Sequence, residues 1–167
     1  MNAKTCRPRK AGFFRNSMWR LMPAATESAQ TRHAPHSRAK KILIIDDDAV
    51  ILKTTSLKLE SEGYQVVTAT DGSEAIAAMR DQRPDLVLLD ITFPPDIAQG
   101  GRVTWDGFQI MFWLRGLKEA KDVPFIIITG GDRDEYEKRS LAHGALAFFH
   151  KPIHHEDLLP LIETTLS

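Results

Sequence analysis

The chain has 167 residues, of which 43% are hydrophobic and 26% are charged, and its formal net charge is zero. This composition is typical of a globular protein, and the length leaves little room for a second full domain. No apolar run approaches the roughly 18–20 residues that a membrane-spanning helix needs. Arginines interrupt every apolar stretch near the N-terminus, which excludes a secretory signal sequence as well.

The charge is unevenly distributed along the chain. Residues 1–39 contain eight basic residues and one acidic residue, a net charge of +7, so the remainder carries −7. They lack sustained periodicity, which predicts a basic, disordered extension before a domain at 40–167. Such a charge could bind nucleic acid or an anionic membrane, although a tail without a partner is the favoured interpretation. The single cysteine, Cys6, excludes an internal disulfide and favours a cytoplasmic location.

From residue 40 onward, short apolar runs alternate with segments of helical periodicity. The predicted strands are Ile42–Ile45, Gln65–Ala69, Leu86–Leu89, Phe125–Thr129 and Ala145–Phe149. The predicted helices are Ala49–Ser61, Ser73–Asp81, Phe108–Ala120, Asp134–Ala142 and His155–Leu166. Five strand–helix pairs in strict alternation predict a doubly wound α/β fold, in which five helices flank a five-stranded parallel sheet.

Polar residues gather where these strands end. The first strand runs into Asp46-Asp47-Asp48, the third into Asp90, the fourth closes with Thr129, and Lys151 follows the fifth. In such a sheet, functional groups meet at the carboxyl ends of the strands. Carboxylates that close repel one another unless a cation lies among them, and hard oxygen ligands suit Mg²⁺ or Mn²⁺. Together with a lysine and a hydroxyl, they could stabilise a phosphoryl group transferring to Asp90.

Four sequence blocks carry a family resemblance: ILIIDDDAVIL at 42–52, LVLLDITFP at 86–94, FIIITG at 125–130 and GALAFFHKPI at 144–153. In order and spacing they resemble the signature blocks of two-component response-regulator receiver domains. The resemblance implies a flavodoxin-like sheet with strand order 2-1-3-4-5. It also implies a Mg²⁺-dependent phosphoacceptor that is not an enzyme in the usual sense, phosphorylated by a sensor histidine kinase or a histidine phosphotransfer protein.

The resemblance assigns roles residue by residue. Asp90 would accept the phosphoryl group, while Asp46, Asp47, Asp90 and the backbone carbonyl of Thr92 would bind the metal. Phosphate binding and switching would fall to Thr129, Lys151 and Phe148, and a cis peptide bond would precede Pro152. The positions of Thr92 and Gly131 would govern the lifetime of the phosphoryl group, and a glycine there offers no side chain to orient an attacking water. The implied protein is a stand-alone receiver without a DNA-binding domain, which signals through a protein–protein surface.

Some residues near these blocks favour simpler roles or depart from the family pattern. Asp48 opens a predicted helix and is interpreted as its cap rather than as a metal ligand. The pair His154-His155 has no third ligand nearby and is interpreted as solvated. Residues Asp96–Thr104 form an apparent insertion after Asp90, for which we expect either a lid role or partner docking.

Three other functions remain open at this stage. The closest is a receiver-like scaffold that binds its partners constitutively and is never phosphorylated. An aspartyl-phosphate hydrolase of the haloacid-dehalogenase kind would require an aspartate at the position of Thr92. A flavodoxin-like nucleotide binder would place its phosphate loop where Asp46, Asp47 and Asp48 stand.

Overall fold

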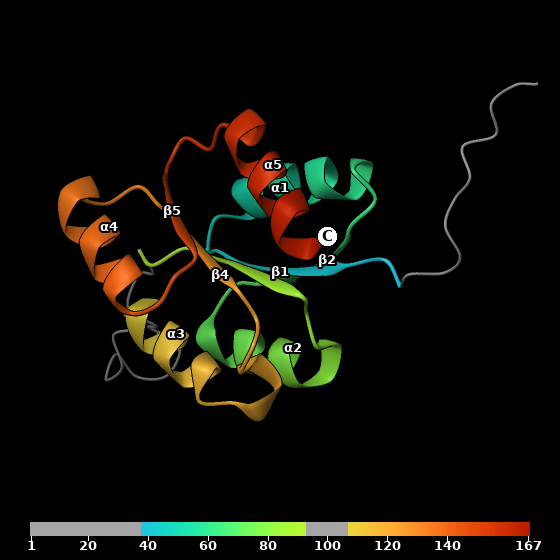
Figure 1. Cartoon of the computed structure of the whole chain (residues 1–167), viewed down its shortest axis with the longest axis horizontal. Coiled ribbons are helices and arrows are strands. Elements are labelled where there is room, and N and C mark those ends of the chain that lie inside the picture. The colour runs from blue at the N-terminus through green and yellow to red at the C-terminus, as the bar shows by residue number, and fades with distance from the viewer. Residues whose placement is uncertain (1–37, 93–106) are drawn as a thin grey trace, which may run out of the picture. The chain divides into compact units, whose positions relative to one another are not determined.

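The computed structural model describes residues 38–92 and 107–167 of the chain. The strands are β1 Lys41–Ile45, β2 Gln65–Ala69, β3 Leu86–Leu89, β4 Phe125–Thr129 and β5 Ala147–His150. The helices are α1 Ala49–Ser61, α2 Gly72–Gln82, α3 Gly107–Arg115, α4 Arg133–Ala142 and α5 His155–Leu166, with a 3-10 turn at Lys118–Ala120. All strand pairings are parallel and the order is β2-β1-β3-β4-β5, which confirms the predicted fold (Figure 1).

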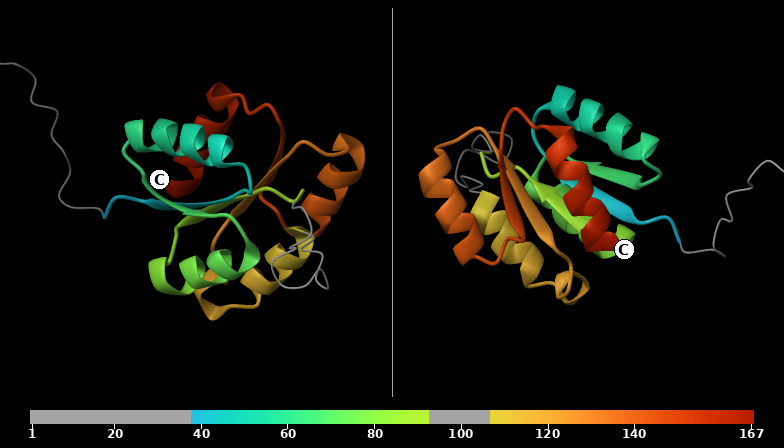
Figure 2. Two further views of the ribbon diagram at one scale, coloured as in Figure 1. Left: turned by 180° about the vertical axis from the view of Figure 1, so that it is seen from behind. Right: turned by 45° about the horizontal axis from the view of Figure 1, so that its top comes forward.

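The three central strands are almost continuously apolar because both faces of the sheet are covered. Helices α1 and α5 lie on one face, and α2 and α3 lie on the other (Figures 1 and 2). Successive residues of β1 therefore enter different cores: Ile42 and Ile44 pack with α1 and α5, whereas Leu43 and Ile45 pack with α2 and α3. Every residue of β3 and β4 is buried, as expected for strands buried on both sides.

Aspartates fix the starts of three helices. Asp48 accepts hydrogen bonds from the backbone N–H groups of Val50 at 2.8 Å and Ile51 at 3.3 Å, so its predicted role as a cap is confirmed. Asp71 and Asp132 each accept one hydrogen bond from the backbone N–H three residues on, at 2.8 and 3.0 Å. Each cap satisfies donors that have no partner within the helix, which sets where the helix begins.

Two predicted boundaries were wrong by more than one residue. The helix predicted over Phe108–Ala120 ends at Arg115, because the N–H of Leu117 bonds to the carbonyl of Leu114, three residues back, and Leu117 itself is extended. The strand predicted from Ala145 begins only at Ala147. The N–H of Ala145 still bonds to the last turn of α4, at the carbonyl of Ser140, and this holds the backbone out of the sheet.

Gly107 lets α3 begin directly against the end of β3. A Cβ atom at this position would lie 2.3 Å from the Cα of Ile91 and 2.9 Å from the carbonyl oxygen of Asp90. A glycine is therefore required for the close approach that holds α3 beside Asp90. The predicted insertion Asp96–Thr104 and almost all of the predicted extension lie outside the described residues.

Arg38 belongs to the folded part of the chain, since its guanidinium contacts the carboxylate of Asp85 at 3.0 Å. That ion pair is largely exposed and adds little stability. Among the described residues, no helix combines the length and the apolar character needed to cross a bilayer.

Candidate functional site

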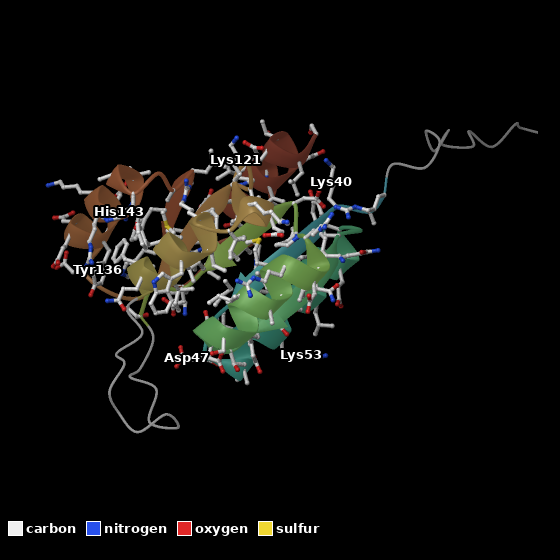
Figure 3. The ribbon with its side chains drawn as sticks, turned by 90° about the horizontal axis from the view of Figure 1, so that it is seen from below. Lys40, Asp47, Lys53, Lys121, Tyr136 and His143 are labelled. Atoms are coloured by element: carbon white, nitrogen blue, oxygen red, sulfur yellow. The ribbon has the colours of Figure 1, made fainter. Side chains whose placement is uncertain are left out.

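The sheet brings the carboxylates of Asp46 and Asp90 together. These residues directly follow the neighbouring strands β1 and β3, and the N–H of Asp90 donates to the carbonyl of Ile45 at 2.8 Å. Both side chains are buried, whereas Asp47 is exposed. One carboxylate oxygen from each of the three aspartates lies within 4.8 Å of the others. Figure 3 shows Asp47 and Lys40 at opposite ends of β1, which puts the acidic cluster at the carboxyl edge of the sheet.

Lys151 lies between the two buried carboxylates. Its Nζ atom is 2.7 Å from Oδ2 of Asp46 and 2.5 Å from Oδ2 of Asp90. The N–H of Lys151 donates to the carbonyl of Thr129, and the Lys151–Pro152 peptide bond is cis, as the sequence resemblance implied. The fold thus brings Lys151 into contact with Asp46, which is 105 positions away in the sequence, and with Asp90, which is 61 positions away.

The charges of this cluster depend on one another. Burial raises the pKa of Asp46 above its ordinary value, and the hydrogen bonds from Lys151 and from the N–H of Asp48 only partly offset that effect. Burial by itself would lower the pKa of Lys151, but its hydrogen bonds and charge contacts with Asp46 and Asp90 outweigh burial and raise it. The ammonium therefore stays charged at neutral pH, while the charge on Asp46 is disfavoured by its surroundings.

Asp46→Asn is expected to raise the free energy of unfolding at neutral pH when a chelator is present. The raised pKa means that folded Asp46 binds a proton where the unfolded side chain, with an ordinary pKa near 3.8, has lost it. Stability of the natural protein therefore falls as pH rises through that window, and the variant escapes this loss. Urea denaturation at pH about 7 and about 4 should show a gain that shrinks at the lower pH.

Asp47→Asn is the matched control for that experiment, since the Asp47 side chain is already exposed. It should change the urea midpoint little at either pH. A lower midpoint for Asp46→Asn than for the natural protein at neutral pH would contradict the expectation. It would mean that the ion pair with Lys151 outweighs the cost of burying the Asp46 charge.

A chain of hydrogen bonds leads from Asp90 to the end of β4. Oδ1 of Asp90 accepts from both the N–H and the hydroxyl of Thr92, each at 2.8 Å. The Thr92 hydroxyl accepts from the hydroxyl of Thr129 at 3.3 Å, and the N–H of Gly131 donates to the Thr129 hydroxyl at 3.3 Å. Thr129 is fully buried. Four residues singled out in the sequence therefore form one connected network.

Other residues singled out in the sequence lie outside this network. Phe148 is half-buried and packs against the core on the α2 and α3 face. His154 is exposed and His155 is half-buried at the start of α5, and neither belongs to the metal-ligating group found among the described residues. One neighbour of the network was missed in the sequence: the ring of Tyr136, from α4, lies directly over Gly131. Gly131 was the available signal, because a residue without a side chain leaves room for a ring.

Comparison with known proteins agrees with this geometry. Residues 42–163 match the family model described as the response regulator receiver domain. The chain belongs to the response regulator receiver family. The receiver domain is 32% identical over 127 residues to the protein PilH of Pseudomonas aeruginosa, covering 76% of this chain and 98% of PilH. It is 33% identical to the probable transcriptional regulatory protein TcrX of Mycobacterium tuberculosis, of which it covers 46%.

Solved structures show the same receiver fold. A CheY-like receiver domain protein from Methanospirillum hungatei aligns with a TM-score of 0.66 and 33% identity, covering 77% of this chain and 94% of that one. The chemotaxis protein CheY4 of Vibrio cholerae aligns with a TM-score of 0.66 and 29% identity, covering 77% of this chain and all of that one. The family predicted from the four sequence blocks is therefore confirmed.

Proposed function

We propose that this receiver domain accepts a phosphoryl group on Asp90 from a phosphohistidine of a sensor histidine kinase or a histidine phosphotransfer protein. One observation carries the proposal: Lys151 Nζ contacts the carboxylates of Asp46 and Asp90, within a group of three aspartates. This combination provides a nucleophile, a mobile positive charge and oxygen ligands for a cation at one point of the molecule.

The transfer would use one oxygen of the Asp90 carboxylate as the nucleophile. One carboxylate oxygen forms the new bond to phosphorus, and the phosphorus–nitrogen bond of the donor breaks. The electron pair of that bond stays on the imidazole nitrogen, which takes up a proton from solvent. Lys151 is placed to pair with oxygens of the incoming group, and the Thr129 hydroxyl can turn from Thr92 to donate to it.

The acidic cluster fits a divalent cation. Three carboxylate oxygens within 4.8 Å of one another are hard ligands of the kind that Mg²⁺ or Mn²⁺ takes, and the backbone carbonyl of Thr92 is a proposed fourth ligand. Asp46, Asp47 and Asp90 would hold the ion. When bound, it would neutralise negative charge on the phosphoryl group and on the cluster itself.

The proposed output is a change in a protein-binding surface. Movement of the Thr129 hydroxyl toward a phosphoryl group would break its hydrogen bond to Thr92 and loosen the end of β4. Phe148 is half-buried beside that end, so it is able to repack and alter the surface of α4, β5 and α5. The partner that we propose for this surface is another protein.

The test is incubation of the full chain with a small acyl-phosphate donor and Mg²⁺, followed by intact-mass measurement. We expect the gain of one phosphoryl group, and no gain when the ion is removed with a chelator. Failure to gain a phosphoryl group with Mg²⁺ present would overturn the proposal. It would favour a receiver-like scaffold that binds its partners without phosphorylation.

A further inference from the structure

Gly131 has no side chain, but the space beside it is filled by Tyr136. A Cβ atom on Gly131 would lie 2.0 Å from Cε2 and 2.5 Å from Cδ2 of the Tyr136 ring. Contacts of that kind below 3.0 Å are essentially never seen, so the ring occupies the volume that a residue-131 side chain would take. A rigid, mostly apolar ring therefore stands where another residue at position 131 would place its own side chain.

Several contacts fix the position of this ring. Tyr136 lies in the first turn of α4, where its N–H bonds to the carbonyl of Asp132 and its carbonyl accepts from the Ser140 hydroxyl at 2.6 Å. On the other side, the ring packs against Phe108 of α3, with ring centroids 6.1 Å apart. Arg139 of α4 and His143, the residue that follows this helix, also lie against the Phe108 ring. Figure 3 shows Tyr136 and His143 close together on the same side of the molecule.

The ring stands beside the phosphoacceptor network. The N–H of Gly131 donates to the Thr129 hydroxyl, which donates to the Thr92 hydroxyl, and Thr92 in turn donates to Asp90. The Tyr136 ring therefore lies against Gly131, a member of this network, in the loop between β4 and α4. Figure 3 shows both Tyr136 and Asp47 far from Lys40, the residue that precedes β1.

We propose that the ring of Tyr136 shields the phosphoryl group on Asp90 from water and so lengthens its lifetime. This inference rests on the proposed phosphorylation of Asp90. In hydrolysis, a water oxygen bonds to phosphorus, the bond from phosphorus to the Asp90 oxygen breaks, and its electron pair returns to the carboxylate. The protons of the water pass to the released phosphate and to solvent. The ring fills space beside Gly131 with carbon atoms, so it excludes water there and offers no basic group to activate it.

The experiment compares the decay of the phosphorylated natural chain with that of Tyr136→Ala and Tyr136→Phe. Each protein is phosphorylated with the small donor and Mg²⁺, freed of donor, and followed by intact mass. We expect Tyr136→Ala to lose its phosphoryl group about threefold to tenfold faster, the tenfold limit corresponding to roughly 1.4 kcal/mol in the barrier. Tyr136→Phe keeps the ring and should decay at the natural rate.

Gly131→Ala tests the same idea from the other side of the contact. Its Cβ atom would force the ring away, so we expect faster decay, as in Tyr136→Ala. Added to Tyr136→Ala, where no ring remains to be displaced, Gly131→Ala should have no further effect. Thermal unfolding of each variant controls for loss of structure. A variant whose site is intact should also be phosphorylated at the natural initial rate, so that faster decay in it reports the loss of shielding.

Three results would overturn the inference. These are decay of Tyr136→Ala no faster than that of the natural chain, a Gly131→Ala effect that persists fully without the ring, and a phosphoryl lifetime of Tyr136→Phe longer than that of the natural chain. The last result would assign the tyrosine hydroxyl an activating role. A natural chain that gains no phosphoryl group overturns both proposals, whereas a normal gain with unaltered decay in the variants overturns shielding alone.

Discussion

Asp90→Asn is expected to abolish the gain of a phosphoryl group in the presence of Mg²⁺. The amide is not a nucleophile at neutral pH, and the substitution removes one of the three carboxylates that could hold the cation. The fold should persist, because an asparagine oxygen can still accept the hydrogen bonds that Thr92 donates to Asp90. Intact-mass measurement of both proteins under identical conditions checks the expectation.

Asp48→Asn is the matched control for this substitution. Asp48 directly follows Asp46 and Asp47, but its side chain caps α1. Asparagine caps a helix about as well as aspartate does. The control should therefore gain one phosphoryl group as the natural chain does. A gain that survives Asp90→Asn would place the acceptor elsewhere, and the exposed His154 would become the first residue to test.

Much of the site could be predicted because the carboxyl ends of parallel strands lie at one edge of the sheet, so the residues that follow them are brought together. An aspartate after an apolar strand has one plausible location, the carboxyl edge of the sheet, and Asp46 and Asp90 are found there. That β1 and β3 are neighbours came from the family resemblance, since alternation of strands and helices is compatible with several strand orders. The contacts of Lys151 follow once that order is given.

Other features depend on contacts that no local pattern records. The sequence predicts that Gly131 has no side chain to orient an attacking water, but it does not reveal that a ring from α4 fills the space beside it. Helix α3 ends early, before the extended residue Leu117, although apolar residues continue at helical spacing beyond it. Both outcomes are decided by tertiary packing and by backbone hydrogen bonds, which override the periodicity of a single segment. The insertion at Asp96–Thr104 lies outside the described residues, so its proposed role as a lid or a docking loop stays a prediction.

Lys151→Met is expected to lower the free energy of unfolding by about 3 kcal/mol at neutral pH without divalent cations, the order found when one partner of a buried ion pair is removed. The Lys151 side chain is 17% exposed, and its two partners are 4% and 2% exposed, so water can only partly replace it. Two neighbouring buried carboxylates would then face each other without a cation. Urea denaturation in the presence of a chelator measures the loss.

The loss should depend on pH in a defined direction. Without the ammonium, the contacts from Lys151 that lower the pKa of Asp46 disappear, so this raised pKa rises further. The folded variant then holds a proton over a wider range above the ordinary pKa of 3.8 than the natural protein does. Its stability therefore falls more steeply as pH rises through that range, and the deficit is largest at neutral pH and shrinks toward pH about 4.

Mg²⁺ should restore more stability to Lys151→Met than to the natural chain, because a cation that binds only the folded state stabilises it and no longer competes with the ammonium. Lys118→Met is the matched control: its side chain is 90% exposed, so neither pH nor Mg²⁺ should alter its small effect. Equal losses in the two variants, or a Lys151→Met deficit that grows at low pH, would contradict the expectation. Either result would mean that Lys151 does not hold the buried carboxylates together, and the cation site built around them would have to be reconsidered.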